Sequence, residues 1–230
     1  MEDRKSRRQK IAILHPRSFI LDLLSKGGRS RREVVSGIYT WPWFSEPHGY
    51  NFNGHLIRHA GGNLCIDPVQ PAEEDLKEIA RHGVARILLT NRNHSRAANE
   101  VRARTGARTA IHPADALHAR SQSAELDDEL NIGDKVGPLV VVGVPGKSPG
   151  EVALHWPERK ILIVGDAVVG DPPGRCKLLP EKVIDAPARL RESVRALLAL
   201  DFDILLPGDG APILQGAKER LRELVNTFPK

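Results

Sequence analysis

The sequence predicts a mixed α/β (α+β) fold in which two sheets pack face to face and helices cover their outer faces, a four-layer αββα sandwich. Apolar runs of strand length fall into two groups along the 230 residues, and each group continues into alternating strands and helices. The predicted order is β-β-β-α-β-α-β-α followed by β-β-β-α-β-α. A content of 40% hydrophobic and 27% charged residues excludes a disordered or fibrous chain.

Basic residues are concentrated at the start of the chain. Residues 1–32 hold ten Lys or Arg against three Asp or Glu, a net charge of +7, so the rest of a chain of net charge +5 carries −2. We therefore expect a basic arm at residues 1–33, with a short helix around Phe19–Leu24, and a single domain at residues 34–230. The arm could contact nucleic acid or be a solvated tail, whereas the domain has no charge excess that would attract nucleic acid.

Cysteine content and hydropathy restrict the class of protein. Two cysteines, Cys65 and Cys176, rule out a disulfide framework and a cysteine-rich zinc module. No apolar run approaches the roughly 18 residues that span a membrane, and no secretory signal follows the basic start. We expect a cytoplasmic protein without membrane association, and the sequence leaves its oligomeric state open.

The first half of the domain predicts strands followed by strand–helix units. The runs VVSGIYTW, NGHLIRH and NLCID are typical of strands and are separated by the turn-rich SEPHGYNFN and by AGG. PAEEDLKEIARHG places Leu76, Ile79 and Ala80 on one helical face and has Gly83 just past its end. RILLT then predicts a strand, SRAANEVRARTG a helix, RTAIH a strand and PADALHAR a short helix.

The second half repeats this plan after a polar connection at residues 121–133. PLVVVGVPG and KILIVGDAV predict apolar strands, with the more amphipathic strand EVALHW between them. DPPGRCKLLPEKVID is a long irregular segment, which is usual for functional or mobile loops. ARLRESVRALLALD predicts a helix, DILLP a strand and APILQGAKERLRELVNTF a closing helix.

Polar residues and glycines follow four of the predicted strands. RILLT leads into residues 91–96, VVVGVP into 146–150, ILIV into 165–167 and DILLP into 208–210. Buried strands hold the loops at their ends in fixed positions, and glycine allows sharp turns and close approach. We therefore expect the functional site where these four loops meet.

The four loops resemble those of the metallo-β-lactamase superfamily. That family carries H-x-H-x-D-H after a strand ending in Thr, then G-H-[ST]-x-G, G-D and P-G-H-G; the corresponding segments here are T-N-R-N-H-S-R, G-K-S-P-G, G-D and P-G-D-G, in the same order. NGHLIRHAGGNLCIDP also resembles the family's opening strands, which end in an aspartate. The resemblance covers most of residues 35–225 and implies the αββα sandwich and a hydrolase-like scaffold.

The family's metal ligands are largely replaced. By the resemblance, Asn91, Asn93 and Lys147 stand at the histidines of the first metal site. Ser95 and Arg96 replace ligands of the second site, and Asp209 replaces the final histidine. Only Asp166, the bridging ligand, is retained.

These replacements remove the chemistry that binds zinc. Zinc takes imidazole, thiolate or carboxylate ligands, whereas the asparagine amide is a weak ligand and arginine is always cationic. Without the metal, the pKa of water stays too high to supply hydroxide at neutral pH. The sequence therefore predicts no zinc cofactor and no dinuclear zinc hydrolysis.

Charged side chains are expected to take the place of the metal ions. The cations Arg96 and Lys147 balance the anions Asp166 and Asp209, which predicts an internal ion-pair network. His94 is displaced by one position from the motif and could be a ligand, a base or polar surface. The alternative is a single hard divalent metal, such as magnesium, manganese or calcium, held by Asp166, Asp209 and His94.

Other reactive side chains have structural interpretations beside their functional ones. Lys147 could be a nucleophile, Asp166 and Asp209 an acid–base pair, and Cys176 a thiol activated by the neighbouring Arg175 and Lys177. Ser95 and Ser148 suit helix-cap or turn positions. The aromatic residues before the second strand could wall a ligand pocket or form a local cluster: Trp41, Trp43, Phe44 and Tyr50.

Two function classes follow from the sequence. The first is a family member without metal that binds a small ligand, which could be anionic, or a protein partner. The second is a hydrolase of a small ester, thioester or lactone that uses a remodelled or single-metal site. The catalytic residues, the ligand and the presence of any catalysis stay open at this stage.

Overall fold

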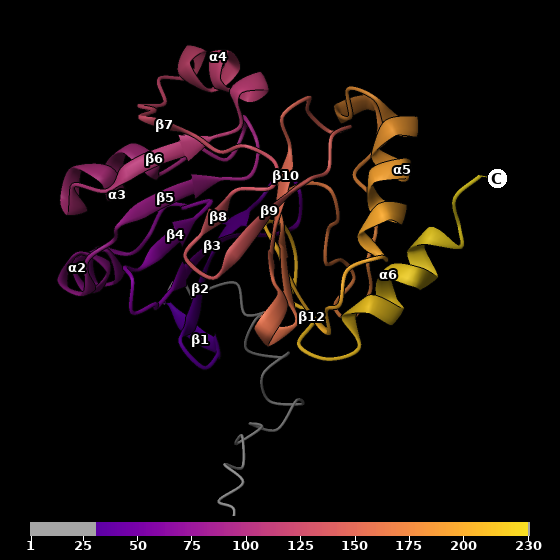
Figure 1. Cartoon of the computed structure of the whole chain (residues 1–230), viewed down its shortest axis with the longest axis horizontal. Helices are drawn as coiled ribbons and strands as arrows, with labels where there is room; N and C mark the ends of the chain where they lie inside the picture. The colour runs from indigo at the N-terminus through magenta and orange to yellow at the C-terminus, as the bar shows by residue number, and fades with distance from the viewer. Residues whose placement is uncertain (1–30, 230) are drawn as a thin grey trace, which may run out of the picture.

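The computed structural model describes residues 31–229, and nearly all of the predicted basic arm with its short helix lies outside the described residues. Two sheets face each other, with helices on their outer sides (Figure 1). In the first sheet the strands lie in chain order: β1 (Arg32–Val35), β2 (Ile38–Ser45), β3 (Tyr50–Ile57), β4 (Leu64–Ile66), β5 (Arg86–Leu89), β6 (Arg108–Ile111) and β7 (Asp128–Glu129). The second sheet has the order β12 (Ile204–Pro207), β11 (Ile161–Val164), β10 (Val152–Trp156), β9 (Leu139–Gly143) and β8 (Lys135–Val136).

Each sheet begins with antiparallel strands and ends with parallel ones. β1 to β4 pair antiparallel and β4 to β7 parallel; β8 to β11 pair antiparallel and β11 and β12 parallel. The helices α2 (Glu73–His82), α3 (Ala98–Thr105) and α4 (Pro113–Ser121) lie beside the first sheet, and α5 (Pro187–Leu197) and α6 (Ala217–Val225) beside the second (Figure 1). The short 3-10 turns are Pro157–Arg159 and Glu181–Val183.

Three apolar clusters fill the three gaps between four layers. Alternation along β11 shows the plan: Ile161 and Ile163 belong to the cluster between the sheets, whereas Leu162 packs with α5 and α6. Leu76 and Ile79 of α2 lie in the third cluster, against the outer face of the first sheet. Successive side chains of a strand point to opposite faces, so a strand buried on both faces is apolar throughout. The predicted αββα sandwich is confirmed.

Four predicted segments differ from the structure. VVSGIYTW is a hairpin of β1 and β2, not a single strand, and the turn in SEPHGYNFN is limited to the four residues between β2 and β3. The closing helix begins at Ala217, because the residues before it lie along β12: Ile213 exchanges backbone hydrogen bonds with Leu205 at 2.8 and 2.9 Å. The connection at residues 121–133 contains β7.

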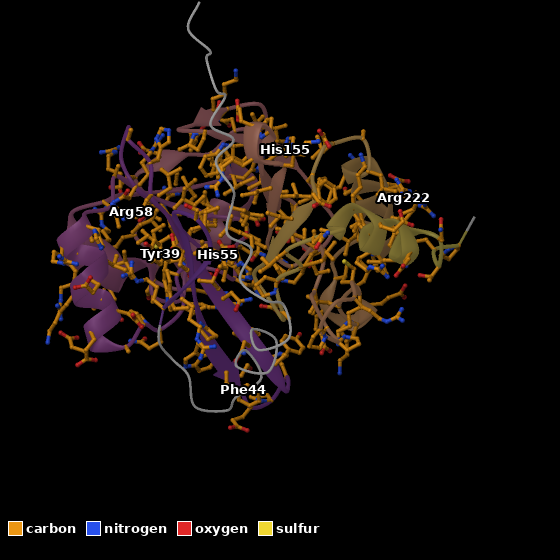
Figure 2. All side chains as sticks on the ribbon, turned by 90° about the horizontal axis from the view of Figure 1, so that it is seen from below. Tyr39, Phe44, His55, Arg58, His155 and Arg222 are labelled. Carbon is orange, nitrogen blue, oxygen red and sulfur yellow. The ribbon has the colours of Figure 1, made fainter. Side chains whose placement is uncertain are left out.

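The two sheets are tied together by backbone hydrogen bonds at one edge. Val152 N donates to Thr90 O at 2.9 Å, and Asn53 N donates to Gly208 O at 2.7 Å. The Asn53 side chain adds bonds to the carbonyls of Pro207 and Gly210. His55, two residues further along β3, lies in the interior, whereas Phe44 lies out on the β2–β3 hairpin (Figure 2). Among the described residues no helix has the length and apolar character needed to cross a bilayer.

Candidate functional site

The loops after β5, β9, β11 and β12 bring a cluster of buried charged side chains together. Lys147, Asp166 and Asp209 are 6%, 5% and 4% exposed, and His94 is fully buried. Ion pairs join members of all four loops, since His94 and Lys147 both contact Asp166 and Arg96 approaches Asp209. Charged groups at this depth require partners, and each has at least one here.

His94 lies between two carboxylates. Its Nδ1 is 2.9 Å from Asp67 Oδ2 and its Nε2 is 3.0 Å from Asp166 Oδ1. Burial by itself lowers the pKa of a histidine, but the charges of Asp67 and Asp166 outweigh it and raise the pKa of His94 to about 10. His94 is therefore an imidazolium at neutral pH and donates from both nitrogens. The interpretation of His94 as loop-tip polar surface is wrong, because the loop folds inward beneath Asp166.

Lys147 forms an ion pair with the second carboxylate oxygen of Asp166. Its Nζ lies 2.9 Å from Asp166 Oδ2, and this is one of the ion pairs that the predicted network allows. Burial alone would raise the pKa of Asp166, but His94 and Lys147 hold it well below its usual range. Both oxygens of Asp166 are thus bound to cations, and its backbone N donates to Glu151 Oε1 at 2.7 Å.

Arg96 approaches Asp209 less closely than Lys147 approaches Asp166. The guanidinium NH2 is 3.7 Å from Asp209 Oδ1, an ion-pair contact without a hydrogen bond, and its Cζ lies 4.2 Å from the centre of the Phe52 ring. Burial and the charge of Asp166 raise the pKa of Asp209 to about 7. The same causes, in the same order, raise the pKa of Glu151 to about 8.

The cluster has an internal charge balance. Its three cations are His94, Arg96 and Lys147. Its four carboxyl groups are those of Asp67, Asp166, Asp209 and Glu151. The net charge of the cluster is zero when one of these carboxyl groups carries a proton. Asp209 and Glu151, with their raised pKa values, are the candidates for that proton. One oxygen of each lacks a hydrogen-bond partner among the described residues.

The remaining predicted site residues in the loop after β5 differ in burial and in their contacts. Asn91 is fully buried; its Nδ2 donates to Glu151 at 3.4 Å and its Oδ1 accepts from Asn93 N at 2.9 Å. Asn93 itself is exposed and does not join the cluster. Ser95 is buried, and of the two predicted roles it has the turn position and not the cap: Ala98 N donates to Ser95 O at 2.6 Å, whereas the N-cap of α3 is Ala97.

Ser148 takes part in a set of hydrogen bonds that joins the loop after β5 to the loop after β9. Its Oγ donates to Asp115 Oδ2 at 2.5 Å, and Asp115 also accepts from Arg92 N and Gly150 N, each at 2.9 Å. This carboxylate, which is fully buried, fixes the loop after β5 against the loop after β9. Asp115 therefore fixes the relative position of the two loops that carry His94 and Lys147, although it contacts neither side chain.

Sequence reasoning did not assign Asp67, Thr90 and Glu151 to the site. Thr90 donates from N and Oγ1 to Asp67, at 2.8 and 2.5 Å, and so orients the carboxylate that faces His94. The position of Asp67, directly after the buried strand NLCI, was the available indication. Nothing in the sequence marks Glu151 as a partner of Asn91.

Two glycines at strand ends are required by close approach. A Cβ on Gly165 would lie 2.3 Å from Thr90 Oγ1, and one on Gly208 would lie 2.8 Å from His94 Cε1. Any larger residue would displace the groups that contact His94. These glycines therefore belong to the site and do not merely form turns.

The donor atoms do not fit a dinuclear zinc centre. His94 as an imidazolium has no lone pair to give, both oxygens of Asp166 face cations, and the Asn91 oxygen already accepts a hydrogen bond. Among the described residues, one group of donors lies within ligand range: His94, Asp166 and Asp209, mutually within 4.8 Å. That set could hold one ion only if Lys147 withdrew from Asp166 and His94 lost its proton.

Aromatic side chains of the β2–β3 hairpin stand beside the cluster. Ring centres of Trp43 and Phe52 are 5.8 Å apart, those of Tyr50 and Phe52 are 6.2 Å apart, and Lys177 Nζ lies 5.4 Å from the Tyr50 ring. Burial and the charges of Asp209, Asp166 and Asp171 raise the pKa of Tyr50 to about 12. The hairpin and the segment after β11 thus form the outer edge of the site. Trp41 instead is buried in the core.

Two other sequence features lie away from this chemistry. Burial and Glu223 raise the pKa of Cys176 to about 12, so the hypothesis of an activated thiol there is wrong. An open hollow of about 420 Å³, lined in part by Glu33, Arg58 and Asn63, lies at the far end of β3 from Asp209.

Comparison with known proteins identifies the family. A family model described as the metallo-beta-lactamase superfamily matches residues 33–228, so the chain belongs to this superfamily. The hydroxyacylglutathione hydrolase of Cereibacter sphaeroides is 31% identical over 176 residues, which are 74% of this chain and 64% of that protein. The chain therefore spans less than two thirds of that relative's length.

Solved structures agree on the fold. The metallo-β-lactamase from Pontibacter korlensis superposes with a TM-score of 0.70 at 18% identity, over 86% of this chain and 99% of that one. The DIM-1 metallo-β-lactamase exposed to ceftazidime gives a TM-score of 0.71 at 17% identity, over 86% of this chain and 96% of that one. At these identities the likeness shows the αββα sandwich and says nothing of activity.

Proposed function

We propose that this protein is a metal-independent member of the superfamily that binds a small ligand at the former metal centre and does not hydrolyse it through zinc. The observation that carries the proposal is the buried contact of Lys147 Nζ with Asp166 at 2.9 Å. An ammonium group there supplies the positive charge that a bridging metal ion would supply. A second cation on the same carboxylate, His94, completes the compensation.

The absence of an activated nucleophile supports binding rather than hydrolysis. A metal-free hydrolase needs a general base or nucleophile near the substrate. His94 is protonated and enclosed, Lys147 is committed to Asp166, and Cys176 has a raised pKa. Asp209 and Glu151 have pKa values of about 7 and 8, which would suit a general base, but both carboxyl groups are buried, and they lie among the cations of the cluster. The described residues of the cluster therefore mainly hold charge in fixed positions.

Metal analysis and activity assays test this proposal together. Protein purified without chelator should contain far less than one equivalent of zinc, iron or manganese by mass spectrometry. Chelation should leave the melting temperature unchanged, because no ligand of the folded state is removed. Addition of zinc should produce no turnover of hydroxyacylglutathione, ester or lactone substrates. Stoichiometric metal together with turnover that chelation abolishes would overturn the proposal.

The second candidate is a single-metal hydrolase. It is favoured by the three donors His94, Asp166 and Asp209 within 4.8 Å of one another and by the 31% identity to a hydroxyacylglutathione hydrolase. Under this alternative, one divalent ion displaces Lys147 and the substrate is a small thioester or ester. Asp209→Asn should then abolish both metal binding and turnover, whereas under the first proposal it changes neither.

A further inference from the structure

Arg96 is held in place at the edge of the site but forms no hydrogen bond there. Its guanidinium stacks on Phe52 with Cζ 4.2 Å from the ring centre, and its charge lies 3.7 Å from Asp209 Oδ1. No hydrogen bond joins it to any residue between 31 and 229. Arg92, which belongs to the same loop, differs in this respect, because its guanidinium donates two hydrogen bonds of 2.7 and 2.8 Å to the carboxylate of Asp185.

Stacking leaves the edge of the guanidinium open. The five N–H donors of an arginine lie in the plane of its guanidinium, so a contact through the face of that group leaves them free for a planar acceptor. The Arg96 side chain is 22% exposed, so the ring of Phe52 fixes its orientation while part of it still meets solvent. The ordering of this long side chain, which normally opposes binding, is therefore largely complete before a ligand arrives.

A second cation and aromatic surface lie beside Arg96. Lys177 approaches the Tyr50 ring at 5.4 Å, and Tyr50 and Phe52 are two residues apart on β3, so both rings lie on one face of the strand. Lys177 itself pairs with Asp171 and is 42% exposed. The surface thus combines an open guanidinium, a second positive charge and apolar rings.

We infer that Arg96 binds the carboxylate of a small ligand whose apolar or aromatic body lies against the β2–β3 hairpin. This inference rests on the proposed function, because it places that ligand at the edge of the former metal centre. A monoanion fits better than a dianion such as phosphate, since Asp209 lies only 3.7 Å from the guanidinium and repulsion from it increases with ligand charge. A planar carboxylate also matches the guanidinium fork with two parallel hydrogen bonds.

Benzoate, phenyl phosphate and benzamide are the probes that test this assignment. Each is titrated into the full-length protein by calorimetry, and benzoate should bind saturably. Neutral benzamide, which has the same ring, and phenyl phosphate should each bind at least about tenfold more weakly, because a charge-assisted bond is lost or a dianion is repelled.

Variants assign the effect to Arg96. Arg96→Gln should weaken benzoate binding by about tenfold or more, and Arg96→Lys should recover only part of it, since lysine keeps the charge but not the fork. Arg159→Gln is the matched control, because Arg159 also stacks on a ring, 4.8 Å from the centre of Trp156, at the opposite end of β11. This control should bind benzoate like the parent, and melting curves establish that each variant is folded.

Chelation separates this inference from the proposed function. If benzoate binding persists in EDTA and depends on Arg96, the carboxylate site stands whatever the metal analysis shows. If the protein holds stoichiometric metal and EDTA removes benzoate binding, metal ligation explains the binding and the inference fails with the proposed function. Equal binding of benzoate and benzamide, no saturable binding, or unchanged affinity in folded Arg96→Gln overturns the inference alone.

Discussion

Replacement of Lys147 by methionine isolates the charge that compensates Asp166. The variant keeps most of the apolar stem of the side chain, so packing changes little, but it removes the ammonium 2.9 Å from Asp166 Oδ2. At this separation, and with an effective dielectric constant of about 20, the attraction is about 6 kcal/mol, and the cost of desolvating the ammonium offsets several kcal/mol of it. His94 still pairs with the carboxylate. We expect a loss of about 3 kcal/mol in the free energy of unfolding.

Lys160 provides a matched control for this experiment. Its Nζ lies 2.9 Å from Asp201 Oδ2, the same distance, but these side chains are 58% and 71% exposed instead of 7% each. Lys160→Met should therefore cost less than about 1 kcal/mol. Urea denaturation with equal m-values measures both changes. Equal stability of Lys147→Met and the parent would refute the reasoning that the ammonium replaces a metal charge at this site.

Further predictions concern the buried carboxylate of Asp115, the buried His55 and the partly exposed ion pair of Arg92 with Asp185. Asp115→Ala should destabilise the fold by about 3 kcal/mol or more in urea, because three donors lose their acceptor, and the bonds from Ser148 Oγ and Gly150 N are buried; a loss below about 1 kcal/mol would contradict this. Burial lowers the pKa of His55 to about 4, so the unfolded chain takes up a proton first as pH falls, and stability should decline between about pH 6.5 and 4 by about 3 kcal/mol from this group. His55→Leu should flatten that part of a stability–pH curve, and an unchanged slope would disprove the assignment. Arg92→Gln should cost less than about 1 kcal/mol, because Arg92 and Asp185 are 22% and 42% exposed, and a larger loss in thermal melts would show that this pair is structural.

Local patterns in the sequence were sufficient for the architecture. Strand alternation, helical spacing around Leu76 and Ile79, and glycine beyond helix ends are properties of short segments, so they predict elements without knowledge of the fold. Boundaries failed where tertiary pairing overrode such patterns. The segment around Ile213 has helix-like neighbours, yet its backbone bonds to β12.

The location of the site also followed from the sequence, whereas several roles within it did not. The sequence by itself determined which residue types stand at the ends of the buried strands, and from these an ion pair of Lys147 with Asp166 or Asp209 could be predicted; the structure has the pair with Asp166. The sequence did not determine that Asn93 is exposed outside the cluster or that Glu151 belongs to it. Side-chain direction within a loop depends on the surrounding packing, which no short segment encodes.

Only the tertiary structure decided the state of His94. Its two partners come from different sheets, Asp67 after β4 and Asp166 after β11, and Asp166 is 72 residues away along the chain. Sequence spacing assigned this histidine several possible roles because the pKa of a buried group depends on neighbours that folding brings within about 3 Å. The sheets, whose strands are set by local alternation, thus bring together two carboxylates that convert a loop histidine into a buried cation.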